Sequence, residues 1–361
     1  MNNLLYYLGF SYHLGIGPYK LGELLKQFKT PKAAYEAPFK DLIQTLSIEC
    51  ATKFDTFRKK VDLEVELNKI TKLGIKVFCQ EDEEYPEHLR KIPDAPICLY
   101  VKGNADLLKL PQEMFIAVVG TRDASSYGLQ IAKEYATEFA ELGRIIVSGM
   151  ALGIDGEAHK AALTAKAKTI AVMGHGLNYI YPSHHRFLYQ QILDTGGAVV
   201  SEFRPGQVAL PGLFITRNRI ISGLSKGVLV VEGKITSGAL STGRCGLAQD
   251  RDVFCIPGSP NNELAQAPNQ LIKENASLVT DVSDVYLKYN ITFSRKKRSP
   301  KVSELSENQL IIFSKLLKKP LSADEISERM SQPIDLVLSD ISRLEILGEI
   351  ERNDEGKYQI L

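Results

Sequence analysis

The sequence lacks several features that mark other classes of protein. Its five cysteines are an odd count, and none belongs to a CxxC pair of the kind found in zinc sites and redox motifs. No apolar run approaches the roughly 18 residues of a membrane span, and the N-terminus has no basic segment before its first apolar stretch. We therefore expect reduced thiols, no membrane insertion and a cytoplasmic location.

The sequence also has no excess of positive or negative charge. The chain has 44 Lys and Arg against 43 Asp and Glu, a formal charge of +1, so no overall positive field attracts nucleic acid or membranes. A polyanionic partner must therefore be bound by a local site. The hydrophobic share of 44% and the charged share of 24% match average globular composition, which excludes a disordered, collagen-like or coiled-coil chain. The 361 residues suggest two or three domains of about 150 residues each.

Short apolar runs alternate with helix-length segments in the middle of the chain. Continuous apolarity is typical of strands buried on both faces of a parallel sheet, and this alternation is typical of a doubly wound fold. The sequence therefore predicts an α/β domain with a doubly wound, mostly parallel sheet. Two more apolar runs, 76–80 and 97–103, could extend it. The six central runs are 115–120, 144–149, 169–174, 198–202, 227–233 and 252–258.

The two ends of the chain have different patterns. Residues 1–63 are helical, and their GIGP turn fits either a helix-hairpin-helix module that presents amides to a phosphate or a small packing domain. Residues 291–302 form a basic linker with four contiguous cations, which we interpret as an exposed tether. Residues 303–361 predict three helices and a hairpin, as in a winged helix. This segment has 7 Lys and Arg against 12 Asp and Glu, a charge of −5, which favours a protein partner over DNA.

The familiar nucleotide-binding signatures are absent from the strand ends. GTRDASSYG does not match GxGxxG, and GHGLNY lacks the third glycine, so an NAD site is not supported. EGKITSG places Lys234 before Ile235 rather than before Ser or Thr, which argues against a P-loop. We therefore predict no cofactor.

Cations and glycines follow several of the predicted strands. Since ligands of doubly wound sheets bind beyond the carboxyl ends of the strands, we expect Arg122, Arg217 and Lys234 to converge on a phosphate-bearing ligand. Two residues apart on a helix, Arg217 and Arg219 point to different faces, so one is expected to enter the crevice and the other to brace it. The candidate phosphate-binding residues are Gly120, Thr121, Arg122, Gly149, Arg217, Asn218, Arg219, Lys234, Ser237 and Gly238.

Catalytic and metal-binding patterns are weak. Asp155 and His159 are spaced i, i+4 on one helix, which favours a local brace because no nucleophile stands beside them. His175, His184 and His185 lack an accompanying carboxylate set. Glu202 and Glu232 end two strands, where they could polarise a hydroxyl or a water but more readily hold Arg217 and Arg219. We therefore predict no catalytic residue and no metal ligand.

Seven loop motifs in order resemble the DNA-processing protein A family, also called DprA or Smf. They are GTRDASSYG, SGMALGIDGEAH, TIAVMGHGLNYIYP, SEFRPG, FITRNRIISGLS, VVEGKITSGAL and VFCIPGSP. The resemblance implies an extended Rossmann-like domain over 64–290 that binds single-stranded DNA without cleaving it. It also implies homodimers and loading of the RecA recombinase during natural transformation. By motif, Gly120 to Arg122 match the family's GxR loop, Arg217 and Asn218 its RN pair, and Lys234, Ser237 and Gly238 its Lys-x-x-Ser-Gly turn.

The chain departs from the family pattern in three places. Met150 and Leu152 replace the Leu and Arg of SGLARGID, Gly233 stands where Ala is usual, and Ala267 begins a turn that commonly begins with Gly. Tyr127 and Phe214 are candidate stacking partners for bases.

Two rival functions remain open. One is a nucleotide hydrolase of the phosphoribohydrolase type, although PGSPNNE differs from the PGGxGTxxE loop of such enzymes. The other is a recombination scaffold that acts through the acidic C-terminal segment.

Overall fold

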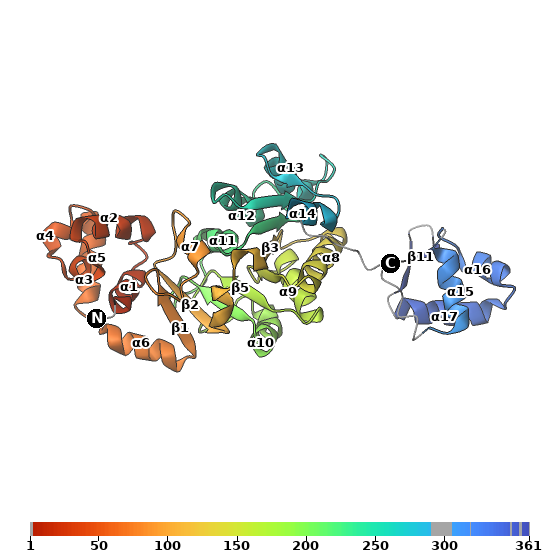
Figure 1. The fold of residues 1–361 in the computed structure, drawn as a ribbon, viewed down its shortest axis with the longest axis horizontal. Coiled ribbons are helices and arrows are strands. Elements are labelled where there is room, and N and C mark those ends of the chain that lie inside the picture. Colours follow the sequence, from red (N-terminus) through yellow and green to blue (C-terminus); the bar gives the residue numbers. More distant parts are fainter. Residues whose placement is uncertain (1–2, 290–304, 318, 347–348, 354–355, 361) are drawn as a thin grey trace. The chain divides into compact units, whose positions relative to one another are not determined.

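A nine-stranded sheet is the centre of the larger part of the protein (Figure 1). The computed structural model describes residues 3–289, 305–317, 319–346, 349–353 and 356–360. It divides into two compact units, 1–291 and 292–361. Within the described part of the first unit, the strands are β1 (Ile75–Cys79), β2 (Cys98–Gly103), β3 (Phe115–Val119), β4 (Ile145–Ser148), β5 (Thr169–Met173), β6 (Ala198–Ser201), β7 (Gly227–Val230), β8 (Asp252–Cys255) and β9 (Ser277–Leu278).

The sheet is mostly parallel, as predicted. Its order is β1-β2-β6-β5-β4-β3-β7-β8-β9. Within the described part of this sheet, only β1 with β2 and β2 with β6 pair antiparallel. All eight predicted apolar runs form strands, including the two that were expected to extend the sheet. The short edge strand β9 was not predicted, because two residues are too few for a periodic signal.

The strand order creates a switch point between β3 and β7. From β3 the chain adds β4, β5 and β6 on one side, and it then returns to place β7 against the other side of β3. The two strands pair in parallel from Ile116 opposite Gly227 to Val119 opposite Val230. Because the connections from neighbouring strands diverge here, a crevice opens beyond their carboxyl ends.

Helices cover both faces of the sheet. In the first unit they are α1 (Leu4–Ser11), α2 (Pro18–Phe28), α3 (Pro31–Glu36), α4 (Phe39–Leu42), α5 (Ile48–Arg58), α6 (Leu63–Lys72), α7 (Glu87–Arg90), α8 (Ser126–Glu141), α9 (Ile154–Thr164), α10 (Arg186–Asp194), α11 (Pro211–Leu224), α12 (Gly238–Ala248), α13 (Gln266–Lys273) and α14 (Val282–Lys288). Successive strand residues point to opposite faces, so Leu99 and Val101 join one core while Cys98 and Tyr100 join the other. Burial on both faces explains the continuous apolarity of the strands.

The N-terminal helices share a core with the sheet, although residues 1–63 were expected to form a separate domain. Leu8 and Phe10 belong to the same core as Tyr100 of β2. The hydroxyls of Ser11 and Tyr100 lie 2.8 Å apart, and the Tyr7 hydroxyl donates to Glu81 at 2.9 Å. The expected boundary at residue 63 therefore does not separate compact units, because one apolar core crosses it.

The second unit has the predicted element order. Three helices, α15 (Glu307–Leu316), α16 (Ala323–Met330) and α17 (Ile334–Ile346), precede an antiparallel hairpin of β10 (Ile350–Arg352) and β11 (Tyr358–Ile360). Ser306 and Ser322 start α15 and α16 in capping boxes. The basic run 295–298 lies outside the described residues. Across the described ranges, no helix is both long enough and apolar enough to cross a membrane.

A candidate anion-binding pocket

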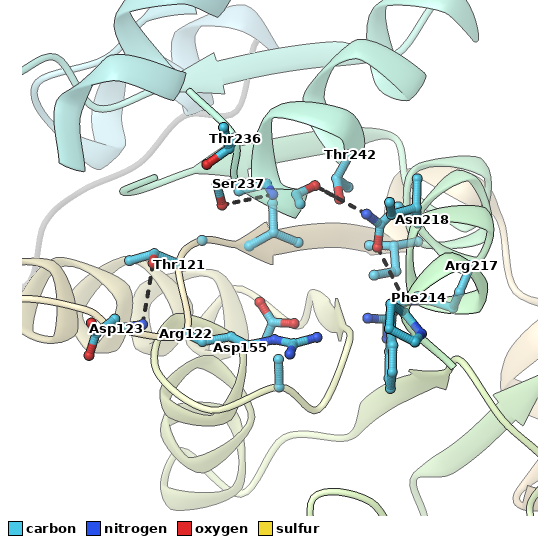
Figure 2. Close-up of a pocket in the computed structure, with 18 of the residues that line it drawn as sticks. Thr121, Arg122, Asp123, Asp155, Phe214, Arg217, Asn218, Thr236, Ser237 and Thr242 are labelled. Atoms are coloured by element: carbon cyan, nitrogen blue, oxygen red, sulfur yellow. Dashed lines mark hydrogen bonds between the residues drawn. The ribbon is translucent and has the colours of Figure 1, made fainter. Parts of the chain in front are cut away.

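A cavity of about 520 Å³ lies beyond the carboxyl ends of β3 and β7 (Figure 2). This volume is within the usual range for small-ligand sites. Eight of the ten predicted phosphate-binding residues line it: Gly120, Thr121, Arg122, Arg217, Asn218, Lys234, Ser237 and Gly238. The strand ends thus bring together three segments that are far apart in the sequence.

The loop after β3 is held by close backbone packing. The Thr121 amide donates to the carbonyl of Glu232 at 2.8 Å, and the Thr121 hydroxyl accepts from the Asp123 amide at 3.2 Å. A Cβ on Gly120 would overlap the side chain of Ile154, so the loop can lie this close to α9 only with glycine there. This packing presents the exposed side chain of Arg122 to the pocket.

The loop after β7 leads into the N-terminus of α12. The Gly233 amide donates to the Leu264 carbonyl at 2.6 Å, and the Gly233 carbonyl accepts from the Ala267 amide at 2.7 Å. Ser237 caps α12, its hydroxyl accepting from the Ala239 amide at 3.2 Å. The pocket therefore borders the positive end of a helix.

Lys234 is paired where it enters the pocket. Its Nζ lies 2.6 Å from Oε2 of Glu263, and both side chains are largely exposed. The hydrogen bond to Glu263 raises the pKa of Lys234. Lys234 is therefore a cation whose present partner is an exposed carboxylate.

Arg217 is a buried cation in the wall of the pocket. It is 4% exposed, and its Nη1 donates to the carbonyl of Gly149 at 2.7 Å and also to that of Val172. Asn218, the next residue, accepts from Arg217 Nε at 3.3 Å and donates to the Gly238 carbonyl at 3.1 Å. The RN pair therefore joins α11 to β5, to the loop after β4 and to α12.

Gly149 does not line the pocket. A Cβ at this position would overlap the guanidinium of Arg217. Its carbonyl is instead one of the acceptors that hold Arg217. The predicted contact between Gly149 and a phosphate is thus replaced by a packing role, which the close approach of the arginine explains.

The electrostatics of the pocket favour an anion. Burial lowers the pKa of Arg217 to about 10, the nearby Asp155 carboxyl opposes this shift, and the charge of Arg122 adds to it. Arg217 thus remains charged at neutral pH beside a second arginine. The guanidinium carbons of Arg122 and Arg217 lie 5.2 and 6.0 Å from the ring centroid of Phe214. An anion beside both would offset their mutual repulsion.

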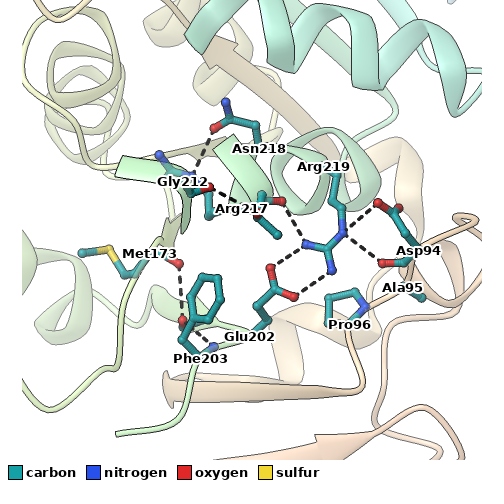
Figure 3. A network of polar contacts seen from close by, with 12 residues as sticks. Asp94, Ala95, Pro96, Met173, Glu202, Phe203, Gly212, Arg217, Asn218 and Arg219 are labelled. Carbon is teal, nitrogen blue, oxygen red and sulfur yellow. Dashed lines mark hydrogen bonds and ion pairs between the residues drawn. The ribbon is translucent and has the colours of Figure 1, made fainter. Parts of the chain in front are cut away.

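Arg219 points away from the pocket (Figure 3). Its Nη1 and Nη2 donate to Glu202 at 2.5 and 2.7 Å, and its Nε donates to the Asp94 carbonyl at 2.9 Å. The placement of Arg219 among the phosphate-binding residues does not fit this geometry, because the bidentate pair with Glu202 and the bond to Asp94 already satisfy its guanidinium. As expected, one of the two arginines, Arg217, lines the pocket, and the other, Arg219, braces the fold.

The two strand-end glutamates have different partners. Glu202 holds Arg219, as expected. Glu232 does not hold Arg217; its carboxylate accepts from the amide of Ser125 at 3.0 Å and from its hydroxyl at 2.6 Å. That expectation was wrong because Glu232 lies against the start of α8, whose N-cap is Ser125.

Asp155 and three of the candidate histidines, His159, His175 and His185, bond within the fold, whereas His184 is exposed. Asp155 accepts from the Gly149 amide at 3.1 Å, and His159 Nδ1 lies 2.7 Å from the Thr169 hydroxyl, which agrees with a bracing role. His175 contacts the carbonyls of Gly176 and Tyr181, and His185 that of Met150. Within the described ranges, no three His, Cys, Asp or Glu side chains gather as a metal-binding group.

An aromatic wall of the pocket was only partly predicted. Phe214 lines the cavity with Tyr181, and their ring centroids are 5.6 Å apart at 41°. Tyr181 was missed because nothing distinguishes one tyrosine of its loop from another; its position before Pro182 was the available signal. Tyr127 is 55% exposed but does not line the cavity.

The departures from the family pattern lie around the same pocket. Leu152 is 42% exposed next to Ala151, which lines the cavity. Met150 is buried with a positive φ of 57°. Ala267 lies in the first turn of α13, where its amide bonds Gly233. The sequence thus places an exposed apolar side chain, not a cation, next to a lining residue of the pocket in the loop after β4.

Comparison with known proteins gives a consistent result. The family model described as DNA recombination-mediator protein A matches residues 76–290. Protein Smf of Escherichia coli is 38% identical over 312 residues, which cover 84% of this chain and 82% of that protein. DNA processing protein DprA of Streptococcus pneumoniae is 44% identical over 208 residues, covering 58% of this chain and 72% of that protein.

Two solved structures of such proteins share the fold. The X-ray structure of DprA from Streptococcus pneumoniae superposes with a TM-score of 0.67 at 35% identity, covering 81% of this chain and 99% of that one. A Helicobacter pylori DNA processing protein A, described for its unique single-stranded DNA binding mode, gives a TM-score of 0.54 at 28% identity. That match covers 60% of this chain and 97% of the other.

Proposed function

Because the chain belongs to the DNA recombination-mediator protein A family, we propose that its pocket binds the phosphate backbone of single-stranded DNA. The observation that carries the proposal is the convergence of Arg122, Arg217 and Lys234 on one cavity. They come from the loop after β3, from α11 and from the loop after β7. Three cations from three segments beside a helix N-terminus form a site for a polyanion.

The three cations have different tasks in this proposal. Arg122 and Lys234 are exposed and can follow a phosphate as it enters, whereas Arg217 is fixed by backbone carbonyls. Binding a phosphate to Arg217 costs little conformational entropy, because this side chain is already ordered. The proposed order of events is capture by the exposed pair and seating against Arg217.

The aromatic wall explains a preference for single strands. Phe214 and Tyr181 lie beside the cations, and unpaired bases can stack on such rings while their phosphates contact the arginines. In a duplex the bases are stacked on one another, so their faces are not accessible. The single-stranded DNA binding described for the Helicobacter pylori relative supports the same proposal.

The proposal includes no bond-breaking step. The hydroxyls of Thr121, Ser237 and Thr242 in the pocket bond backbone groups, so none of these bonds links a nucleophile to a side-chain base. Glu232, the carboxylate that a nucleotide hydrolase would use here, instead accepts hydrogen bonds from Ser125, the N-cap of α8. We therefore prefer a binding protein to a hydrolase.

The wider role rests on the family. We propose that the protein acts in the cytoplasm as a homodimer, protects single strands and loads the RecA recombinase onto them during natural transformation or recombination. The acidic C-terminal unit, with a charge of −5 over 303–361, is suited to contact a protein in this process.

A direct test compares single-stranded and duplex DNA of one sequence. The parent protein is expected to bind the single strand at least about tenfold more tightly, and Arg122→Ala should lower that affinity by about tenfold. The matched control is Lys26→Ala, an exposed and paired cation on α2. Equal binding of both DNA forms, or full binding by the Arg122 variant, would remove the support for the proposal.

A further inference from the structure

A second, shallow groove adjoins the pocket along α12. It is lined by the Ile235–Ser237 turn and by one face of the helix: Leu240, Ser241, Arg244, Cys245 and Ala248. Thr236 and Ser237 line both hollows, and Figure 2 shows them at the edge of the pocket where α12 begins. A chain that leaves the pocket across this turn enters the groove directly.

The groove has the chemical features of a nucleotide subsite. Ile235, which is 49% exposed, and the buried Leu240 both line it. Residues 237, 241, 244 and 248 follow the i, i+3 and i, i+4 spacing of one helix face. That face therefore presents hydroxyls near the turn, an apolar floor, and the cation of Arg244 one turn beyond Ser241.

Arg244 is ordered by its partner. Its Nε and Nη2 donate to Glu274 at 2.9 and 2.6 Å, and Gln270 donates to the same carboxylate at 2.8 Å. These bonds hold the pKa of Glu274 at about 2. Among the described residues, both bonds of Arg244 use one edge of the guanidinium, so Nη1 keeps its donors for another oxygen.

The arrangement around Arg244 repeats that around Lys234. In both cases an exposed cation at the edge of a hollow is held by a glutamate from the segment 263–274. The two cations lie on either side of the Ile235–Ser237 turn in the sequence, and each lines one of the two connected hollows. Two such cations, one at each hollow, are available to successive phosphates of one strand.

We propose that the single strand leaves the pocket over the Ile235–Ser237 turn and that its next nucleotide occupies the groove. Its phosphate contacts Arg244, and its base lies against the exposed side chain of Ile235. This inference rests on the proposed function, because it extends the same DNA path. Because Thr236 and Ser237 line both hollows, one strand can reach both, which favours DNA over a separate small ligand.

The test compares oligothymidylates of about 4 and about 16 nucleotides by fluorescence anisotropy. Arg244→Gln should weaken binding of the longer strand by about three- to tenfold and reduce the slope of log affinity against log salt by about 0.7. The shorter strand, which fills only the pocket, should bind unchanged. Arg244→Lys, which keeps the charge, should keep the slope.

Two control variants distinguish a phosphate contact at Arg244 from an indirect effect of charge. Lys26→Gln removes an exposed cation paired with Glu23 on α2 and should leave binding of both strands unchanged. The double variant Arg244→Gln with Glu274→Gln removes both charges of the pair. If Arg244 binds phosphate, the double variant remains weak; if it recovers full affinity, the loss came from an unmasked Glu274 and the inference is wrong.

The results for the two strands also show whether the proposed groove subsite fails alone or together with the proposed DNA-binding pocket. If Arg244→Gln binds both strands like the parent while Arg122→Ala is weak, the groove is not a DNA subsite and the pocket still is one. If the parent binds neither strand, the proposed function and the inference both fail. A selective loss for the longer strand supports both.

Discussion

Lys234 Nζ lies 2.6 Å from Glu263 Oε2, so one cation of the pocket is already paired with a carboxylate. A DNA phosphate must replace this carboxylate to reach Lys234. Since both side chains are exposed, the pair is weak and exchange is easy. Under the proposed function, Glu263 therefore competes with DNA for Lys234.

Replacing Glu263 should strengthen DNA binding. Glu263→Gln is expected to raise the affinity for single strands by about two- to fivefold at low salt, because Lys234 loses its competing partner. The difference should shrink as salt screens both interactions. Titrations at several salt concentrations measure it, with Glu23→Gln on α2 as the matched control. Unchanged or weaker binding at low salt would show that Glu263 does not compete.

An alanine at position 149 should disturb Arg217. Its Cβ would overlap the guanidinium, so the arginine must leave the carbonyls of Gly149 and Val172. We expect Gly149→Ala to cost about 1–3 kcal/mol of folding free energy and to weaken single-strand binding by about tenfold. Gly212→Ala on the same helix as Arg217, where a Cβ meets no atom within 4 Å, is the control. Normal binding by Gly149→Ala would mean that Arg217 does not need this position.

Glu202 should matter for stability and not for DNA. Its removal leaves the Arg219 side chain, only 6% exposed, without its main partner. We expect Glu202→Ala to lower the free energy of unfolding by about 3 kcal/mol, measured by urea denaturation. The affinity of the folded variant for single strands should stay within about twofold of the parent. A large loss of DNA affinity in variant protein that is still folded would indicate that Arg219 is part of the binding site.

Acid should destabilise the first unit through buried histidine. Burial lowers the pKa of His159 to about 3, with the charges of His185 and Arg217 adding to the shift. The unfolded chain binds this proton near the ordinary value of about 6.5. The contribution of His159 is therefore complete above that pH and is lost as pH falls from about 6.5 toward 3, by at most about 1.4 kcal/mol per pH unit.

The test of this pH dependence uses a variant that cannot titrate. His159→Gln should be less stable than the parent at neutral pH, because it loses the contact with Thr169. Its stability should fall less steeply on acidification. Urea unfolding between about pH 4.5 and 7.5 compares the slopes, and parallel slopes would rule out His159 as a source of the acid sensitivity.

Much of the fold could be predicted because strong local signals decide it. Strands buried on both faces are continuous apolar runs, so β2 to β8 were found, whereas β1 was found although its residues alternate between buried and exposed. Arg122, Arg217 and Lys234 could be expected at one rim because parallel strands end at the same edge. These inferences need only periodicity and topology.

The remaining features depend on packing that leaves no periodic trace. The shared core of Phe10 and Tyr100 joins segments whose sequence patterns are those of independent units. The bond from Arg219 to Asp94 joins residues 125 positions apart, and no local pattern marks it. Likewise, only the folded chain brings Tyr181 to Phe214.

The central claim is that the pocket cations bind DNA phosphates, and the salt dependence of single-strand binding tests it most directly. Arg122→Gln and Lys234→Gln should each reduce the slope of log affinity against log salt by about 0.7, and the double variant by about 1.4. Slopes equal to that of the parent in all three variants would contradict the account.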